Sequence, residues 1–215
     1  NYYKKTIEIN SNFAPAYFNF ANTLKEIGEY EKAINYYKKT IEINPNFIEA
    51  LNNLGILYNQ IGEYKKAINI FEQSLQINPK YVDAHNSLGI LYDGISEYQK
   101  AINCFENALA IEPYNLTSHW LSMNIFPVIY KNSEEIIFFK NRFKNSLKKI
   151  SKLIDSKSKF DNKQLLNAIS SSTNFYLHYQ GTDVLELQRE YAGLIEKITN
   201  KIYKNFHKKR KKNNK

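Results

Sequence analysis

Residues 1–10 read NYYKKTIEIN, and residues 35–44 repeat the same ten letters 34 positions later. A second block, LGILY, begins at Leu54 and again at Leu88, with the same step. Self-similarity at a fixed period indicates a repeat architecture, in which each unit buries its apolar face only against its neighbours. Prolines keep the period as well, at Pro45, Pro79 and Pro113.

Each unit has the pattern of two helices joined by a tight turn. In residues 48–81, an apolar stripe at Leu51, Leu54 and Tyr58 predicts a first helix. Gly62 tolerates the positive φ at which that helix stops, and Pro79 ends the next helix because proline cannot continue one. The second stripe consists of Tyr64, Ala67, Ile68, Phe71 and Leu75. Small residues are expected where helix axes approach: Ala21, Gly55, Gly89, Ala33, Ala67 and Ala101.

This pattern resembles the tetratricopeptide repeat family. Full units span residues 14–47, 48–81 and 82–115, and residues 1–13 are the end of an earlier one. Two departures are mild, with Ser96 at the interhelical glycine and Ser11 at the first proline. The resemblance implies an all-α, right-handed solenoid whose concave face is lined by first helices and holds a protein or an extended peptide. In the first unit the family positions are Tyr17, Phe20, Ala21, Leu24, Gly28, Tyr30, Ala33, Tyr37 and Pro45.

Asparagines stand at the first-helix positions that should face this groove. An asparagine amide both donates and accepts, so it can hold a peptide bond whatever side chain the peptide carries. The repeats of O-linked N-acetylglucosamine transferases carry such a ladder at the sixth position, which Asn19 and Asn53 match and Ser87 does not. The alternative is that these amides are merely solvated. The groove candidates are Asn19, Asn22, Asn52, Asn53, Asn86 and Ser87.

A groove of the chaperone-binding kind is not expected. Repeats of that kind clamp a C-terminal carboxylate with lysines and an arginine. The corresponding positions here are Phe18, Asp83 and Ser87, so the positive charge that would hold an anion is missing.

Charge is unevenly distributed over the 215 residues, whose net charge is +9. Residues 1–115 carry 10 Lys and 13 Asp or Glu, a balance of −3, and residues 116–215 carry 20 Lys or Arg and 8 Asp or Glu, a balance of +12. The tail, residues 207–215, is strongly basic but has no aromatic residue within the run to stack on bases, so nucleic acid is an unlikely partner. We interpret the tail as a solvated segment.

Cellular context is indicated only weakly. The single cysteine, Cys104, suits a reducing compartment, and no apolar run is long enough for a membrane helix. We therefore expect a cytoplasmic protein with no membrane partner. Because the chain opens on Asn1 inside a repeat, we also expect it to be a fragment. The oligomeric state is not predicted.

The second half, residues 116–206, is predicted to be a helical module. Leu116 to Ile125 continues as one helix, broken by Pro127. Capping patterns predict three more helices, which begin with Asn132 and Glu135, Asp161 and Gln164, and Asp183 and Glu186. On the first of these, an apolar stripe contains Ile136, Phe139, Phe143, Leu147, Ile150 and Ile154.

Residues 116–206 also resemble the region that follows the repeats in bacterial O-linked N-acetylglucosamine transferase (SPINDLY) family proteins. The resemblance rests on PVIY at residues 127–130, an acidic helix start at 133–135, and STNFYLHYQG at 172–181 with Leu187-Gln188 and Tyr191 beyond it. In that family a catalytic region that binds a UDP-sugar follows. The resemblance implies that this chain is the substrate-recruiting arm of such an enzyme and stops before the catalytic region. The signature residues are Asn174, Phe175, Tyr176, His178, Tyr179, Gln180 and Gly181.

No catalytic residue, cofactor or metal site is predicted for this chain. The family places a catalytic histidine near Thr173, which is not histidine, and no two histidines have metal-ligand spacing. Transfer of a sugar by the purified chain would contradict this. Two alternatives stay open: a free-standing repeat adaptor, and a nucleic-acid binder that acts through the basic half.

Overall fold

The computed structural model describes residues 2–156, 160–171 and 184–203. Contacts divide the chain after Gly94 into two compact units. All regular secondary structure within the described residues is helical, so the all-α prediction is confirmed. None of the described helices combines enough length with enough apolar character to cross a bilayer. The predicted domain boundary after Asn115 rests on sequence periodicity and stays a prediction.

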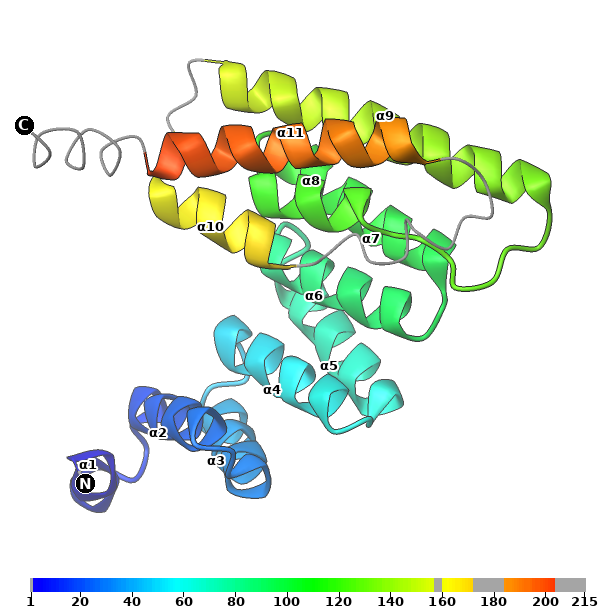
Figure 1. The fold of residues 1–215 in the computed structure, drawn as a ribbon. Coiled ribbons are helices and arrows are strands. Elements are labelled where there is room, and N and C mark those ends of the chain that lie inside the picture. Colours follow the sequence, from blue (N-terminus) through cyan, green and yellow to red (C-terminus); the bar gives the residue numbers. More distant parts are fainter. Residues whose placement is uncertain (1, 157–159, 172–183, 204–215) are drawn as a thin grey trace, which may run out of the picture. The chain divides into compact units, whose positions relative to one another are not determined.

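The first unit consists of consecutive helices that pack side by side in pairs (Figure 1). Helix α2 packs on α3, and α4 packs on α5, as expected of the two helices of a repeat. Helix α1 packs on α2, and α6 packs on α5 and α4, so the main contacts of this unit join near neighbours in the chain. The bounds are α1 Tyr2–Ile9, α2 Ala14–Glu26, α3 Tyr30–Ile43, α4 Ile48–Gln60, α5 Tyr64–Ile77 and α6 Val82–Gly94.

The turns between paired helices follow the predicted chemistry. Gly28 and Gly62 have φ of 81° and 79°, the left-handed conformation that glycine adopts most easily. Ser96, which replaces glycine in the third unit, is forced to a φ of 63°. Because a side chain makes this conformation unfavourable, the third turn keeps its geometry at a cost of about 1 kcal/mol.

Helices α4 and α5 of the second repeat approach each other closely at Gly55. A Cβ built at this position would lie 2.6 Å from Cε1 of Phe71, whose ring is fully buried on α5. The predicted need for a small residue is therefore a direct steric constraint. Tyr64, expected in the apolar stripe, is instead 46% exposed at the start of α5.

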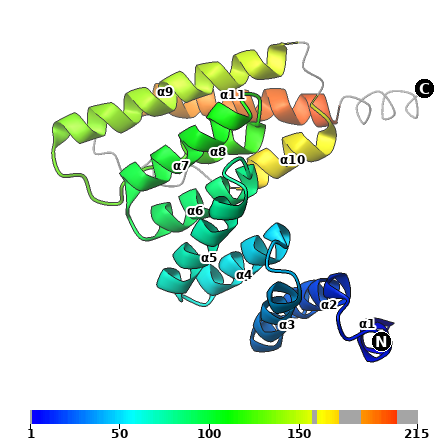
Figure 2. The ribbon, with the colours of Figure 1, turned by 180° about the vertical axis from the view of Figure 1, so that it is seen from behind.

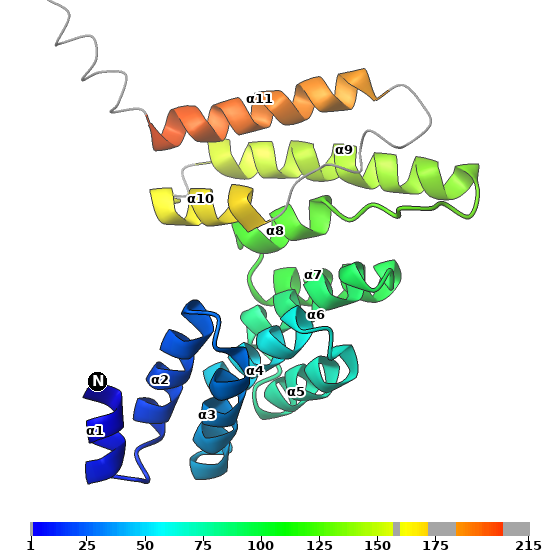
Figure 3. The ribbon, with the colours of Figure 1, turned by 60° about the horizontal axis from the view of Figure 1, so that its bottom comes forward.

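The second unit contains a long helix pair and two shorter helices. Helices α9 and α11 lie side by side, with α8 and α10 packed against each other beneath them (Figures 1 and 3). From behind, α7, α8 and α9 are seen in succession (Figure 2), and α8 contacts both of the others. The bounds are α7 Tyr98–Ile111, α8 Leu116–Met123, α9 Ser133–Asp155, α10 Asn162–Ser171 and α11 Leu185–Ile202.

Two of the predicted helix starts are confirmed in atomic detail. Oδ1 of Asn132 accepts from the Glu135 amide at 2.9 Å. Asp161 and Gln164 form a reciprocal box, with Oδ1 of Asp161 2.7 Å from the Gln164 amide and Oε1 of Gln164 3.0 Å from the Asp161 amide. Helix α11 begins at Leu185 after Val184, and Asp183 lies outside the described residues.

The predicted apolar stripe of α9 is also confirmed. Its residues are buried from Phe139 to Ile154, while Ile136 at the start is partly exposed. Helix α8 ends at Met123, slightly before Ile125, because Asn124 caps it. The buried stripe therefore holds α9 against the shorter helices of this unit.

Helix α8 carries one feature of the repeat past Asn115, where we expected the pattern to stop. Nε2 of His85 lies 2.9 Å from the Pro79 carbonyl, and Nε2 of His119, 34 positions later, lies 2.9 Å from the Pro113 carbonyl. His119 is only 4% exposed. Burial lowers the pKa of its imidazole, and nearby Lys149 lowers it further, although the bond to Pro113 opposes this. The neutral ring is the stable form in the fold.

We expect Gly55→Ala to destabilise the protein. The added methyl group must displace the buried Phe71 ring, which lowers the free energy of unfolding by about 1–3 kcal/mol. The higher helix propensity of alanine offsets this loss by up to about 1 kcal/mol. Gly193→Ala on α11 is the matched control, because nothing lies within 4 Å of its Cβ. Thermal unfolding should show a lower midpoint for Gly55→Ala and a slightly higher one for Gly193→Ala. Equal midpoints would contradict a steric conflict between residue 55 and the Phe71 ring.

We expect the stability of the protein to fall as pH drops below about 6.5, partly through His119. Its folded pKa is lowered, so the unfolded chain binds a proton over this range that the folded chain does not. His119→Gln keeps a donor for the Pro113 carbonyl but cannot titrate. Unfolding midpoints measured between pH 8 and pH 5 should therefore decline less steeply in the variant. Parallel profiles would rule out this contribution.

Candidate functional site

The six groove candidates lie on the first helices α2, α4 and α6, all within the first unit. Asn19 is exposed, whereas Asn22, Asn53 and Ser87 are partly exposed. Asn52 and Asn86 are only 6% and 7% exposed. The structure thus separates the candidates into four that offer surface to a ligand and two that offer almost none.

Asn22 joins three helices through its amide oxygen. Oδ1 accepts from the Tyr37 hydroxyl of α3 at 2.6 Å and from Nδ2 of Asn53 on α4 at 2.9 Å. Tyr37 is fully buried. Burial raises the pKa of Tyr37 to about 12, and the hydroxyl therefore stays a donor at any ordinary pH. This network sets the position of the Asn53 amide at the surface of α4.

Sequence reasoning missed Tyr37 as a member of the site. The sequence feature that could have indicated it is a departure of the first repeat from the apolar pattern of the second. The second repeat has Phe71 at the position of Tyr37 and Ile56 at the position of Asn22. Two polar groups that replace apolar ones in a single repeat are expected to pair, because each would otherwise be buried without a partner.

Asn52 and Asn86 differ from the other four candidates because their side chains are buried. Their Oδ1 atoms are buried, and neither has a hydrogen-bond partner among the residues that the structure describes. A buried amide oxygen without a partner costs about 1–3 kcal/mol. Both atoms lie beneath the surface that a ligand would touch, so the structure gives these two residues no place among exposed groove contacts.

The exposed face of the first helices is acidic and partly aromatic. It carries Glu26, Glu49, Asp83 and Asp93 against Lys25. Asp83 and Glu49 lie close enough to Tyr81 to add to the effect of burial, which together raise its pKa to about 12. At the other end, the Phe18 ring stacks obliquely on Phe47 with centroids 4.8 Å apart. The face therefore combines negative charge with partly exposed aromatic surface.

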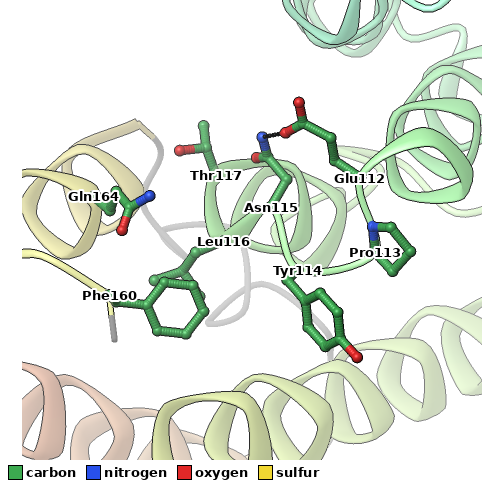
Figure 4. A pocket seen from close by; sticks show the side chains of 8 residues that line it. All are labelled: Glu112, Pro113, Tyr114, Asn115, Leu116, Thr117, Phe160 and Gln164. Carbon is green, nitrogen blue, oxygen red and sulfur yellow. Dashed lines mark hydrogen bonds between the residues drawn. The ribbon is translucent and has the colours of Figure 1, made fainter. Parts of the chain in front are cut away.

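A hollow of about 400 Å³ lies in the second unit between α10 and the turn before α8 (Figure 4). Two of its polar side chains, those of Asn115 and Glu112, bond to each other. Asn115 donates to Glu112 at 2.7 Å and accepts from the Ser118 amide at 2.9 Å, which caps α8. Around Asn115 the lining consists of Glu112, Pro113, Tyr114, Leu116, Thr117, Phe160 and Gln164. This set offers no pairing of a nucleophile with a base.

The part of the chain that the structure describes offers few other groups suited to catalysis or metal binding. Burial raises the pKa of the Cys104 thiol to about 11, so it is protonated and unreactive. No three His, Cys, Asp or Glu side chains among the described residues gather to hold a metal ion. The signature segment, Asn174 to Gly181, lies outside the described residues.

Three family models match the first half of the chain. One described as a TPR repeat matches residues 21–62, and two described as tetratricopeptide repeats match residues 2–35 and 50–112. No curated protein matches the chain.

Solved structures of repeat proteins are similar to this one. The crystal structure of MamA is 25% identical with a TM-score of 0.61, over 74% of this chain and 88% of MamA. MamA from Desulfovibrio magneticus RS-1 is 21% identical with a TM-score of 0.60, over 74% of this chain and 85% of that one. YrrB, described as a TPR protein with an unusual peptide-binding site, is 18% identical with a TM-score of 0.56, over 98% of both chains.

We expect Asn22→Ala to lower the free energy of unfolding by about 1–3 kcal/mol, because two donors lose their acceptor. Tyr37→Phe should cost less, since it removes the donor along with its need for a partner. Chemical unfolding of both single variants and the double variant measures their coupling, which we expect to be about 0.5–1.5 kcal/mol. Strictly additive losses would show that the network is not cooperative.

Proposed function

Because residues 2–112 consist of tetratricopeptide repeats, we propose that this protein binds other proteins, through the exposed face of first helices α2, α4 and α6. The observation that carries the proposal is the anchored Asn53 amide, held by Asn22 at the surface of this face. YrrB, which shares the fold, has a peptide-binding site by its description. An extended peptide is the ligand class we propose here.

Asn19 and Asn53 supply the backbone contacts in this proposal. They occupy equivalent positions one repeat apart, and Ser87 occupies the third. Each amide can accept from a peptide N–H and donate to a peptide carbonyl. Such contacts do not depend on the ligand's side chains, so one groove binds many sequences in one extended conformation. The acidic residues Glu49 and Asp83 bias the choice toward neutral or basic segments.

A narrower form of this proposal concerns what the bound peptide is for. The resemblance of residues 116–206 to O-linked N-acetylglucosamine transferase (SPINDLY) proteins supports recruitment of acceptor proteins to a glycosyltransferase that uses a UDP-sugar. The matches reported above are to repeats and repeat proteins, so this narrower function rests on the second-half residues alone. A cytoplasmic location is part of the same proposal. The alternative is a free-standing adaptor.

Selection of a random peptide library on the intact chain tests the groove. We expect the selected peptides to carry neutral or basic residues and to lose about tenfold in affinity with Asn19→Ala or Asn53→Ala, as loss of one or two hydrogen bonds implies. Affinities would be measured by fluorescence anisotropy. Recruitment of glycosylation acceptors predicts in addition a serine or threonine at a fixed place in the selected sequences.

Asn35→Ala is the matched control, because Asn35 is an exposed asparagine on the second helix α3. It should leave peptide affinity unchanged. Thermal unfolding separates a lost contact from a lost fold, since Asn53→Ala also weakens the network with Asn22. Peptides that bind equally well to Asn19→Ala, Asn53→Ala and the unchanged protein would refute the groove.

A further inference from the structure

Two first helices of the first unit carry the same stripe of side chains in the same order. On α4 the stripe contains Glu49, Asn53 and Ile56, at spacings of four and three residues that bring side chains to one helix face. The equivalent residues of α6, 34 positions later, are Asp83, Ser87 and Ile90. Across the two helices the side chains therefore form three rows, one acidic, one of an amide and a hydroxyl, and one apolar.

The apolar row consists of Ile56, which is partly exposed, and Ile90, which is 45% exposed. In the first repeat this position is Asn22, whose amide oxygen is occupied by Tyr37 and Asn53. A single exposed isoleucine is ordinary on a protein surface. Two of them, at the same place in successive repeats and one turn from the amide row, offer apolar surface that contacts to a peptide backbone do not use.

The spacing of the first helices sets the period of a ligand that crosses them. Helix α4 packs on α6, and the 2.9 Å bond from Asn53 to Asn22 joins α4 to α2. Axes of packed helices lie about 8–10 Å apart. A β-strand returns a side chain to the same face after two residues, about 6.7 Å, whereas a polyproline II chain does so after three, about 9.3 Å. Of these two conformations, polyproline II is therefore the one whose period matches the rows.

Charge favours lysine or arginine in such a ligand. Helices α4 and α6 contain three acids and no lysine or arginine: Glu49, Asp83 and Asp93. Beyond the effect of burial, Asp83 and Glu49 both raise the pKa of Tyr81, so their carboxylates lie near the same hydroxyl. On α2, Lys25 adjoins Glu26, so this helix adds no net charge. The acidic row therefore attracts a basic side chain on the side of the amide row opposite to the isoleucines.

We propose that the ligand of the first-helix face is a polyproline II segment with an apolar residue at every third position, which rests on Ile56 and Ile90. Its lysines or arginines lie on the side of Glu49. The inference rests on the proposed function and names the ligand of that same site. A polyproline II backbone has no internal hydrogen bonds, so its peptide groups are available to Asn53 and Ser87. Prolines in the segment favour this conformation before binding, which lowers the entropy cost of ordering the ligand.

The probe is a fluorescein-labelled peptide of three leucine-lysine-proline units, which in polyproline II spans about 28 Å, enough to cross three first helices. A second peptide has the same composition, but its leucines stand at alternate positions. Fluorescence anisotropy with the full chain should show about tenfold tighter binding of the first peptide. We expect Ile90→Asn to weaken its binding about fivefold. Glu49→Gln should weaken it severalfold at low salt and less at high salt.

Ile77→Asn is the matched control, because Ile77 is 39% exposed at the end of the second helix α5. It should leave the affinity for both peptides unchanged, and thermal unfolding of both isoleucine variants checks that the fold is intact. Equal binding of the two peptides, or equal effects of Ile90→Asn and Ile77→Asn, would overturn the inference.

Asn53→Ala separates failure of this inference from failure of the proposed function. If the two peptides bind equally well and Asn53→Ala weakens both, the groove stands and the three-residue period is wrong. If Asn53→Ala leaves both affinities unchanged, the groove itself is wrong. If neither peptide binds, the inference fails, and the library selection decides independently whether the groove holds peptides of another kind.

Discussion

The close approach of α4 and α5 at Gly55 is the constraint on which the second repeat depends. The Phe71 ring occupies the space that a side chain at position 55 would need. The helix axes come close where a large residue of the second helix packs on a small residue of the first. This packing sets the angle at which the two helices cross. The first repeat uses the same arrangement with Ala21 and Tyr37, both fully buried. Both of these repeats therefore pair a small first-helix residue with a large, buried second-helix residue.

The polar network of the first repeat is built upon this packing. Tyr37 occupies the position of Phe71 in the repeat, and both rings are fully buried. The added hydroxyl reaches Asn22, which in turn holds Asn53 of the next repeat. A buried hydroxyl and two amides thus link α2, α3 and α4. The surface asparagine acquires a fixed orientation from a core residue, which lowers the entropy cost of holding a ligand.

Charge is distributed unevenly along the chain. The first-helix face bears acids, whereas residues 136–154 of α9 contain six lysines and arginines and no acid. Composition alone, with its net charge of +9, would have indicated one basic protein. The charges are separated along the chain, and the helices then concentrate them on separate surfaces.

Period and turn chemistry were readable in the sequence because they are local. The step of 34 residues, the glycines at positive φ and the capping boxes at Asn132 and Asp161 depend on neighbours in the chain. The all-α fold and the ends of the repeat helices at glycine and before proline followed from them. Which asparagines are exposed could not be predicted in this way, because periodicity placed Asn52 and Asn53 on the same helix without showing which one lies beneath the surface.

The repeated decapeptide shows where the sequence stops being sufficient. Tyr3 and Tyr37 stand at the same place in identical ten-residue segments, yet Tyr3 is 38% exposed and Tyr37 is fully buried. Both segments are helical, since helix formation follows from local pattern. Tyr37 is buried because α2 packs on α3, and burial is a property of what lies next to a residue in space. The sequence by itself determined the helices and their period, and only the tertiary structure decided which side chains became core, network or surface.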